Sequence, residues 1–111
     1  MISALTVSGV PTYSFIFEGF LPQKKGRQKK LSELTKEDRT IVLYESSHRI
    51  EKLIDELSEY FANRYVVVCR ELTKKFEEYW RGYPAEIKEK LPEKKVKGEF
   101  VVVISSASWK N

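Results

Sequence analysis

The sequence predicts a layered α/β domain, in which helices flank a mixed sheet of about five strands. Three observations predict this fold class. Short runs rich in β-branched and aromatic residues are typical of strands, and one segment repeats its apolar residues every three to four positions, as amphipathic helices do. The strand-like runs at 65–70 and 76–82 are joined by too few residues for a crossover helix, so we expect an antiparallel pair. With 111 residues, 41% of them hydrophobic, the chain can build one core.

The first half of the chain alternates strand and helix. Residues 15–21 carry large apolar side chains at both odd and even positions, which predicts a strand covered on both faces. Residues 29–36 follow as a helix that turns Leu31 and Leu34 inward. Residues 40–45 are β-branched and apolar, so we expect a buried strand.

The second half opens with the strongest periodic signal. Residues 47–61 are predicted to form an amphipathic helix, capped by Ser46 or Ser47 through a serine oxygen. Its apolar positions are Ile50, Leu53, Ile54, Leu57, Tyr60 and Phe61. The remaining elements are expected to be strands at 65–70, 76–82 and 99–105, a short helix at 85–91, and a frayed end at 107–111.

Charge and cysteine content narrow the function class. The net charge is +4, and residues 23–30 hold five of the 20 basic residues with no acid, which leaves 15 basic against 16 acidic residues elsewhere. Such a local excess fits contact with phosphates, and also a solvated lysine loop that binds nothing. Cys69, the single cysteine, excludes an internal disulfide and is expected to be buried. No signal peptide or membrane-length apolar run is apparent, so we expect a soluble, intracellular protein.

No self-contained catalytic motif occurs, but polar residues follow two predicted strands. There is no P-loop, GxGxxG, GxSxG or HExxH sequence, and one histidine cannot build a histidine-rich metal site. Residues 45–49 and 70–75 each follow a strand, so they could meet at one edge of the sheet, where ligands bind in α/β folds. The alternative is a helix cap and a charged surface turn.

Five segments, in order along the chain, resemble one enzyme family. They are SALTVSGVP (3–11), FEGFLPQKKGRQKK (17–30), VLYESSHRI (42–50), VVVCRELTKKFEEYWRG (66–82) and GEFVVVI (98–104). Together they resemble the C-terminal half of the 16S ribosomal RNA cytidine 2'-O-methyltransferases, within the tetrapyrrole methylase superfamily. One departure is Ser47, where that family usually has proline.

The resemblance implies a function and an architecture. The expected enzyme is a cytoplasmic, two-domain homodimer that binds S-adenosylmethionine between its domains and methylates a cytidine ribose of 16S ribosomal RNA in the small ribosomal subunit. The N-terminal domain would be absent here, and the chain alone would be inactive. A non-catalytic basic RNA-binding module and a tetrapyrrole-type methylase with a small-molecule acceptor stay open as alternatives.

The resemblance also implies roles for particular residues, and no metal ligands. The proton acceptor or its orienting partners are expected among Glu45, His48 and Glu71. Cofactor contacts are expected at Ser8, Gly9, Pro11, Tyr44, Leu72, Thr73 and Gly82. RNA contacts are expected at Lys24, Lys25, Arg27, Lys29, Lys30, Arg49, Lys74 and Lys75.

Overall fold

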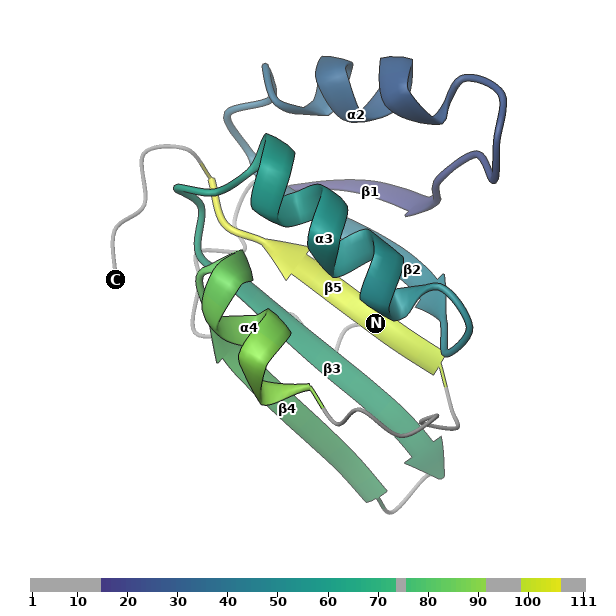
Figure 1. Cartoon of the computed structure of the whole chain (residues 1–111), viewed down its shortest axis with the longest axis vertical. Helices are drawn as coiled ribbons and strands as arrows, with labels where there is room; N and C mark the ends of the chain where they lie inside the picture. Colours follow the sequence, from purple (N-terminus) through teal and green to yellow (C-terminus); the bar gives the residue numbers. More distant parts are fainter. Residues whose placement is uncertain (1–14, 74–75, 92–98, 107–111) are drawn as a thin grey trace.

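The computed structural model describes residues 15–73, 76–91 and 99–106, with the backbone alone for 71–73, 76 and 77. In these ranges a five-stranded mixed sheet has the order β1-β2-β5-β3-β4, and the three described helices cover one of its faces (Figure 1). The predicted fold class is therefore confirmed. The elements are β1 (Phe15–Phe20), α2 (Arg27–Leu34), β2 (Thr40–Ser46), α3 (Ile50–Tyr60), β3 (Val66–Thr73), β4 (Phe76–Gly82), α4 (Pro84–Lys90) and β5 (Glu99–Ile104).

Strand direction within the sheet is mixed. β1 and β2 are parallel, whereas β5 is antiparallel to both of its neighbours, β2 and β3. β3 therefore runs in the same direction as β2, and β4 returns antiparallel to β3, as the short connection requires. The last strand of the chain lies in the middle of the sheet, between β2 and β3.

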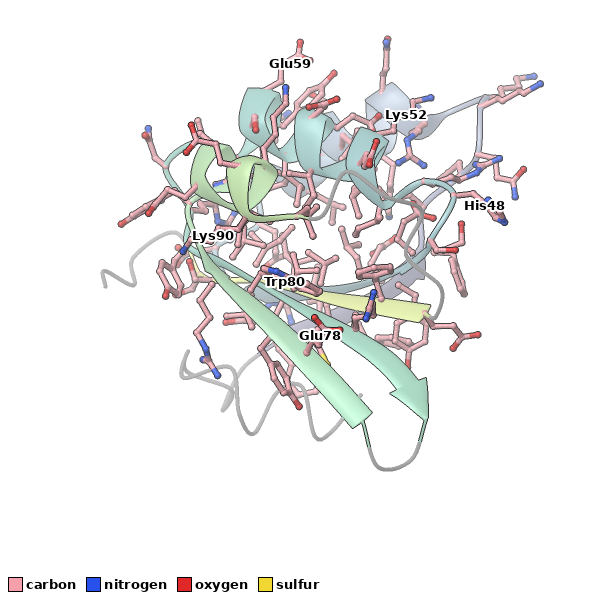
Figure 2. All side chains as sticks on the ribbon, turned by 60° about the horizontal axis from the view of Figure 1, so that its bottom comes forward. His48, Lys52, Glu59, Glu78, Trp80 and Lys90 are labelled. Atoms are coloured by element: carbon pink, nitrogen blue, oxygen red, sulfur yellow. The ribbon has the colours of Figure 1, made fainter. Side chains whose placement is uncertain are left out.

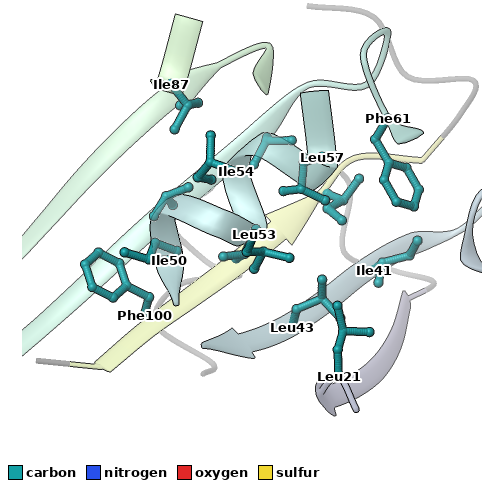
Figure 3. Close-up of a cluster of buried hydrophobic side chains, with 14 of the residues drawn as sticks. Leu21, Ile41, Leu43, Ile50, Leu53, Ile54, Leu57, Phe61, Ile87 and Phe100 are labelled. Carbon is teal, nitrogen blue, oxygen red and sulfur yellow. The ribbon is translucent and has the colours of Figure 1, made fainter. Parts of the chain in front are cut away.

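The main core lies between the sheet and the helices (Figure 3). The periodic apolar positions of α3 face β2 and β5, and Ile87 brings α4 into the same cluster. The predicted inward residues Leu31 and Leu34 of α2 are both buried. None of the helices in the described ranges is long and apolar enough to cross a membrane.

The opposite face of the sheet carries a second, smaller cluster. Its buried members are Val42, Val67, Cys69, Val101 and Val103. Tyr44, Tyr65 and Tyr79 pack partly buried against it. The prediction that Cys69 is buried is confirmed.

β1 departs from the predicted strand covered on both faces. It is an edge strand, hydrogen-bonded only to β2 in the described sheet, and Phe15, Phe17 and Phe20 are exposed. A bulge between Phe17 and Gly19 adds one residue, since Phe17 pairs with Val42 and Gly19 with the very next residue of β2. Gly19 has φ of +71°, a left-handed conformation that favours glycine.

α3 begins later than predicted. Residues 47–49 form a turn, in which the Arg49 amide donates to the Ser46 carbonyl (3.1 Å), and the helix starts at Ile50. No side chain caps this end, so the predicted serine cap is wrong. A turn between strand and helix already satisfies one of the backbone groups that a cap would otherwise serve.

Arg64 ties together segments that are distant in sequence. It is buried, and its guanidinium donates to the carbonyls of Ser105 (2.9 Å), Glu37 (2.9 Å) and Arg39 (3.1 Å). Burial lowers the pKa of this guanidinium from its usual value. The contacts hold the end of β5 against the turn that precedes β2.

Candidate functional site

The carboxyl ends of β1, β2 and β3 meet at one edge of the sheet. Glu45 of β2 is in register with Phe100 of β5, and Phe100 with Arg70 of β3. The two polar segments that follow β2 and β3 therefore do share an edge, as the sequence predicts. At a spacing of about 4.8 Å between strands, the Cα atoms of Glu45 and Arg70 lie two strands, or roughly 10 Å, apart across the sheet.

Glu45 belongs to a buried ion-pair network centred on Arg27. The Arg27 guanidinium donates to both carboxylate oxygens of Glu56 in α3, with Nη2 2.6 Å from Oε1 and Nε 2.9 Å from Oε2. The same Nη2 lies 3.6 Å from Glu45 Oε2, and Nη1 donates to the Pro22 carbonyl (3.1 Å). Glu45 Oε1 also accepts the Ser46 amide (2.8 Å). The network raises the pKa of Arg27, chiefly through the hydrogen bonds to Glu56.

This geometry pairs two of the expected RNA contacts with acids of the same chain. Arg27 is 4% exposed and its charge is met by two carboxylates, so it is unavailable to a phosphate. Lys30 is ion-paired with Glu18 of β1 (2.6 Å), and its pKa is raised by that hydrogen bond. Both partners, Glu18 and Glu56, are acids far from their base in sequence, so local charge counting overstates the free positive charge of residues 23–30.

Three lysines of the segment remain exposed. Lys24 and Lys25 lie in the loop after β1, and Lys29 lies on the outer side of α2. Arg49 is half-buried at the start of α3. The predicted contacts Lys74 and Lys75 lie outside the described residues.

The three candidate proton acceptors differ in their surroundings. His48 is exposed in the turn before α3 and points outward (Figure 2). Glu45 is 5% exposed and held by Arg27 and its neighbouring amide. Glu71 follows Arg70 in β3, and its backbone is in register with Glu99. Of the two candidates whose side chains the structure describes, Glu45 is buried and His48 is accessible.

Arg70 and its neighbours form a polar patch that sequence reasoning did not predict. Arg70 is ion-paired with Glu78 of β4, and its guanidinium carbon lies 6.0 Å from the centre of the Trp80 ring. The Trp80 ring in turn lies 6.4 Å from that of Phe100. Within the described part of the chain, Arg70 Nε is buried without a hydrogen-bond partner. The signal in the sequence that could have predicted this patch is the alternation of residues 76–82, because it places Glu78 and Trp80 on one face of a strand.

The expected cofactor contacts are only partly brought together. Tyr44 and the backbone of Leu72 and Thr73 lie at the shared edge of the sheet. Gly82 lies at the other end of β4, opposite Val66, three strands and three register positions from Tyr44, or roughly 17 Å. The other three expected contacts, Ser8, Gly9 and Pro11, lie outside the described residues.

Gly82 has a structural explanation of its own. A Cβ at this position would lie 3.2 Å from Glu86 Cβ, and its φ is +149°. Glu86 Oε1 accepts the Tyr83 amide (3.0 Å) at the start of α4. The glycine lets this carboxylate fold back over the junction between β4 and α4.

The described part of this edge offers an aromatic ring and an irregular strand end. Tyr44 offers a half-buried aromatic ring. The register of β3 against β4 skips Leu72, and the described pairing of β3 with β5 runs as far as Glu71. Stacking surfaces and backbone hydrogen-bonding groups are what a purine nucleoside needs for recognition.

Two solved structures share this fold. The methyltransferase CobJ superposes with a TM-score of 0.66 at 16% identity, covering 99% of this chain and 48% of CobJ. The uroporphyrin III C-methyltransferase of Thermus thermophilus superposes with a TM-score of 0.59 at 14% identity, covering 92% and 47%. The chain thus has the fold of part of a methyltransferase. It belongs to the tetrapyrrole (corrin/porphyrin) methylase family, whose model matches residues 1–88.

Curated relatives are more similar in sequence. The ribosomal RNA small subunit methyltransferase I of Halalkalibacterium halodurans is 43% identical over 93% of this chain and 36% of its own length. The protein of the same name from Thermotoga maritima is 42% identical over 95% of this chain and 47% of its own length. The chain thus spans less than half the length of these relatives.

Proposed function

We propose that this chain is the C-terminal, RNA-facing half of an S-adenosylmethionine-dependent methyltransferase that acts on small-subunit ribosomal RNA. The observation that carries the proposal is 42–43% identity to ribosomal RNA small subunit methyltransferase I proteins across nearly the whole chain. The finer assignment, a cytidine 2'-hydroxyl of 16S RNA in a cytoplasmic homodimer, rests on the motif resemblance of residues 3–11, 17–30, 42–50, 66–82 and 98–104.

The described residues support a division of tasks along the shared edge. S-Adenosylmethionine, when bound, supplies a methyl group activated by a sulfonium. Tyr44 and the strand-end backbone near Leu72 would hold the adenosine, while the exposed lysines neutralise RNA phosphates. Ribose methylation needs the hydroxyl held in line and its proton removed. His48 is our candidate for the proton acceptor because its side chain is accessible.

Glu45 is better suited to positioning than to accepting a proton. Its carboxylate receives the Ser46 amide and faces the Arg27 guanidinium. Those contacts fix the end of β2 relative to α3. Glu45 would then place the turn that carries His48.

The proposal is tested with protein expressed from its complete natural reading frame. Purified small ribosomal subunits from a strain lacking the gene are incubated with the protein and radiolabelled S-adenosylmethionine. We expect label in 16S RNA, and none when residues 1–111 are supplied alone. Transfer to a tetrapyrrole with no transfer to RNA would favour a small-molecule acceptor. RNA binding without any transfer would favour a non-catalytic module.

A further inference from the structure

An exposed aromatic group lies at the β1 edge, on the face of the sheet opposite the helices. The Phe17 ring centre is 5.1 Å from that of Tyr44, and the Phe20 ring centre is 5.6 Å from it, both edge-to-face. Phe17 is 50% and Phe20 63% exposed, although large apolar side chains normally avoid water. We call Phe17, Phe20 and Tyr44 the aromatic platform.

The bulge of β1 creates this platform. In a regular strand, positions 17 and 20 would point to opposite faces. The extra residue before Gly19 reverses the alternation, so that both phenylalanines reach Tyr44 on one face. A glycine with positive φ inside an edge strand thus serves to present two rings side by side.

The platform is joined to the exposed lysines by a fixed segment. Leu21, directly after Phe20, is buried in the main core, and the Pro22 carbonyl is held by Arg27. Lys24 follows four residues after Phe20, within about 14 Å along the chain. Glu18 is the one acid among residues 17–30, and Lys30 neutralises it. The exposed rings are therefore followed directly along the chain by the uncompensated charges of Lys24 and Lys25.

We propose that the exposed Phe17 and Phe20 rings of the aromatic platform, held edge-on by Tyr44, stack an unpaired base of the RNA substrate, while Lys24 and Lys25 neutralise the flanking phosphates. The inference rests on the proposed function and names the form of RNA that the site takes. Aromatic rings beside a basic groove are the common solution for single-stranded nucleic acid, because every base has a face that can stack. An apolar protein partner would leave the lysines without a role.

The test uses protein from the complete natural reading frame and a short single-stranded RNA that contains the fluorescent base 2-aminopurine. Stacking on the rings is expected to quench this fluorescence in the parent protein. Changing both Phe17 and Phe20 to alanine should restore the fluorescence and weaken binding by about 5- to 150-fold per stacked base. Phe20→Trp should retain binding. Phe15→Ala is the matched control, since Phe15 is 37% exposed on the same strand.

Salt dependence separates the two parts of the surface. The phenylalanine variants should bind more weakly with an unchanged slope of log affinity against log salt. Changing Lys24 and Lys25 to glutamine should reduce that slope by about 1.4, at roughly 0.7 per phosphate of a single strand. Duplex RNA should compete poorly in either case.

Other outcomes overturn the inference. Unchanged RNA affinity in the Phe17→Ala/Phe20→Ala double variant would do so. So would a raised KM for S-adenosylmethionine with RNA binding intact, or a change from dimer to monomer by sedimentation, since either would assign the rings to another partner. If the parent protein neither binds RNA nor methylates it, the proposed function fails instead.

Discussion

Glu37 and Arg39 form a short-range ion pair in the turn that precedes β2. Arg39 Nε donates to Glu37 Oε1 (2.8 Å), and its backbone amide donates to the same oxygen (3.1 Å). These bonds lower the pKa of the Glu37 carboxyl from 4.5 to about 2. The carbonyl of Glu37 also accepts Arg64, so this turn joins a surface pair to a buried arginine.

The pKa of Glu37 makes a pH prediction. Because the folded-state value lies below the unfolded one, the pair stabilises the fold above about pH 4.5, and this contribution is lost as the pH falls towards 2. Carbon-detected NMR titration should give a midpoint near 2 for Glu37, and Arg39→Ala should raise it towards 4.5. A midpoint near 4.5 in the parent protein would show that the pair does not form in solution.

His48 is the residue on which the proposed proton transfer depends. In the complete protein, His48→Gln should lower the methylation rate by roughly 100- to 10,000-fold, the usual contribution of a general base, with little change in RNA affinity. Ser47→Ala, in the same turn, is the matched control and should remain active. Full activity of His48→Gln in a labelled-methyl transfer assay would remove histidine from the mechanism.

At the scale of elements, Arg27 links four parts of the fold. It begins α2, and its guanidinium reaches the loop after β1, the end of β2 and the second turn of α3. Removing one partner of a buried ion pair leaves the other charge uncompensated, at a cost of about 3–5 kcal/mol. The network thus explains why α2 can pack although it contributes few apolar side chains.

Arg27→Ala should therefore lower the free energy of unfolding by about 3–5 kcal/mol, measured by urea denaturation followed by circular dichroism. Lys29→Ala, on the exposed side of the same helix, should change it by less than about 0.5 kcal/mol. Equal effects of the two substitutions on the free energy of unfolding would contradict a structural role for Arg27. Arg27 would then again be a candidate RNA contact.

The β1 bulge makes a second prediction for an element. Gly19→Ala should cost about 1–2 kcal/mol, because alanine resists the left-handed conformation. Gly26→Ala is a matched control, since Gly26 also has positive φ, +84°, but precedes α2. Both variants should lose stability, yet only Gly19→Ala should remove the NMR contacts between the rings of Phe20 and Tyr44. Retained contacts would show that the bulge does not set the platform.

Most elements could be predicted from the sequence, and the departures have physical causes. The period of α3 and the β-branched runs are local signals, so those elements appear where expected. The β1 bulge depends on one glycine, whose conformation is fixed only by pairing with β2. The start of α3 depends on a turn whose backbone bond replaces a serine cap.

The candidate site was less predictable than the fold. The sequence predicted that the two polar segments could share one edge of the sheet. It did not predict which acid each basic side chain pairs with. Arg27 and Lys30 find their acids on α3 and β1, and only the tertiary structure brings them together. Gly82 matched a family motif in sequence, whereas its position at the far end of β4 serves the packing of Glu86.

At the scale of the whole molecule, β5 joins the two halves of the sheet. It comes last in the chain but separates β2 from β3, and its residues contribute to both cores. Pairings of such long sequence separation have no local signal, which is why the strand order could not be predicted. They also bring the ends of β2 and β3 to one edge, where the cofactor and RNA are proposed to meet.

The proposed ribose methylation of 16S RNA is tested most directly by mass spectrometry of that RNA. Nucleosides and RNase fragments from cells lacking the gene are compared with those from cells given back the complete reading frame. The account predicts that one 2'-O-methylcytidine is lost on deletion and returns on complementation. Unchanged 16S methylation after deletion would contradict it, as would loss of a modification at another atom.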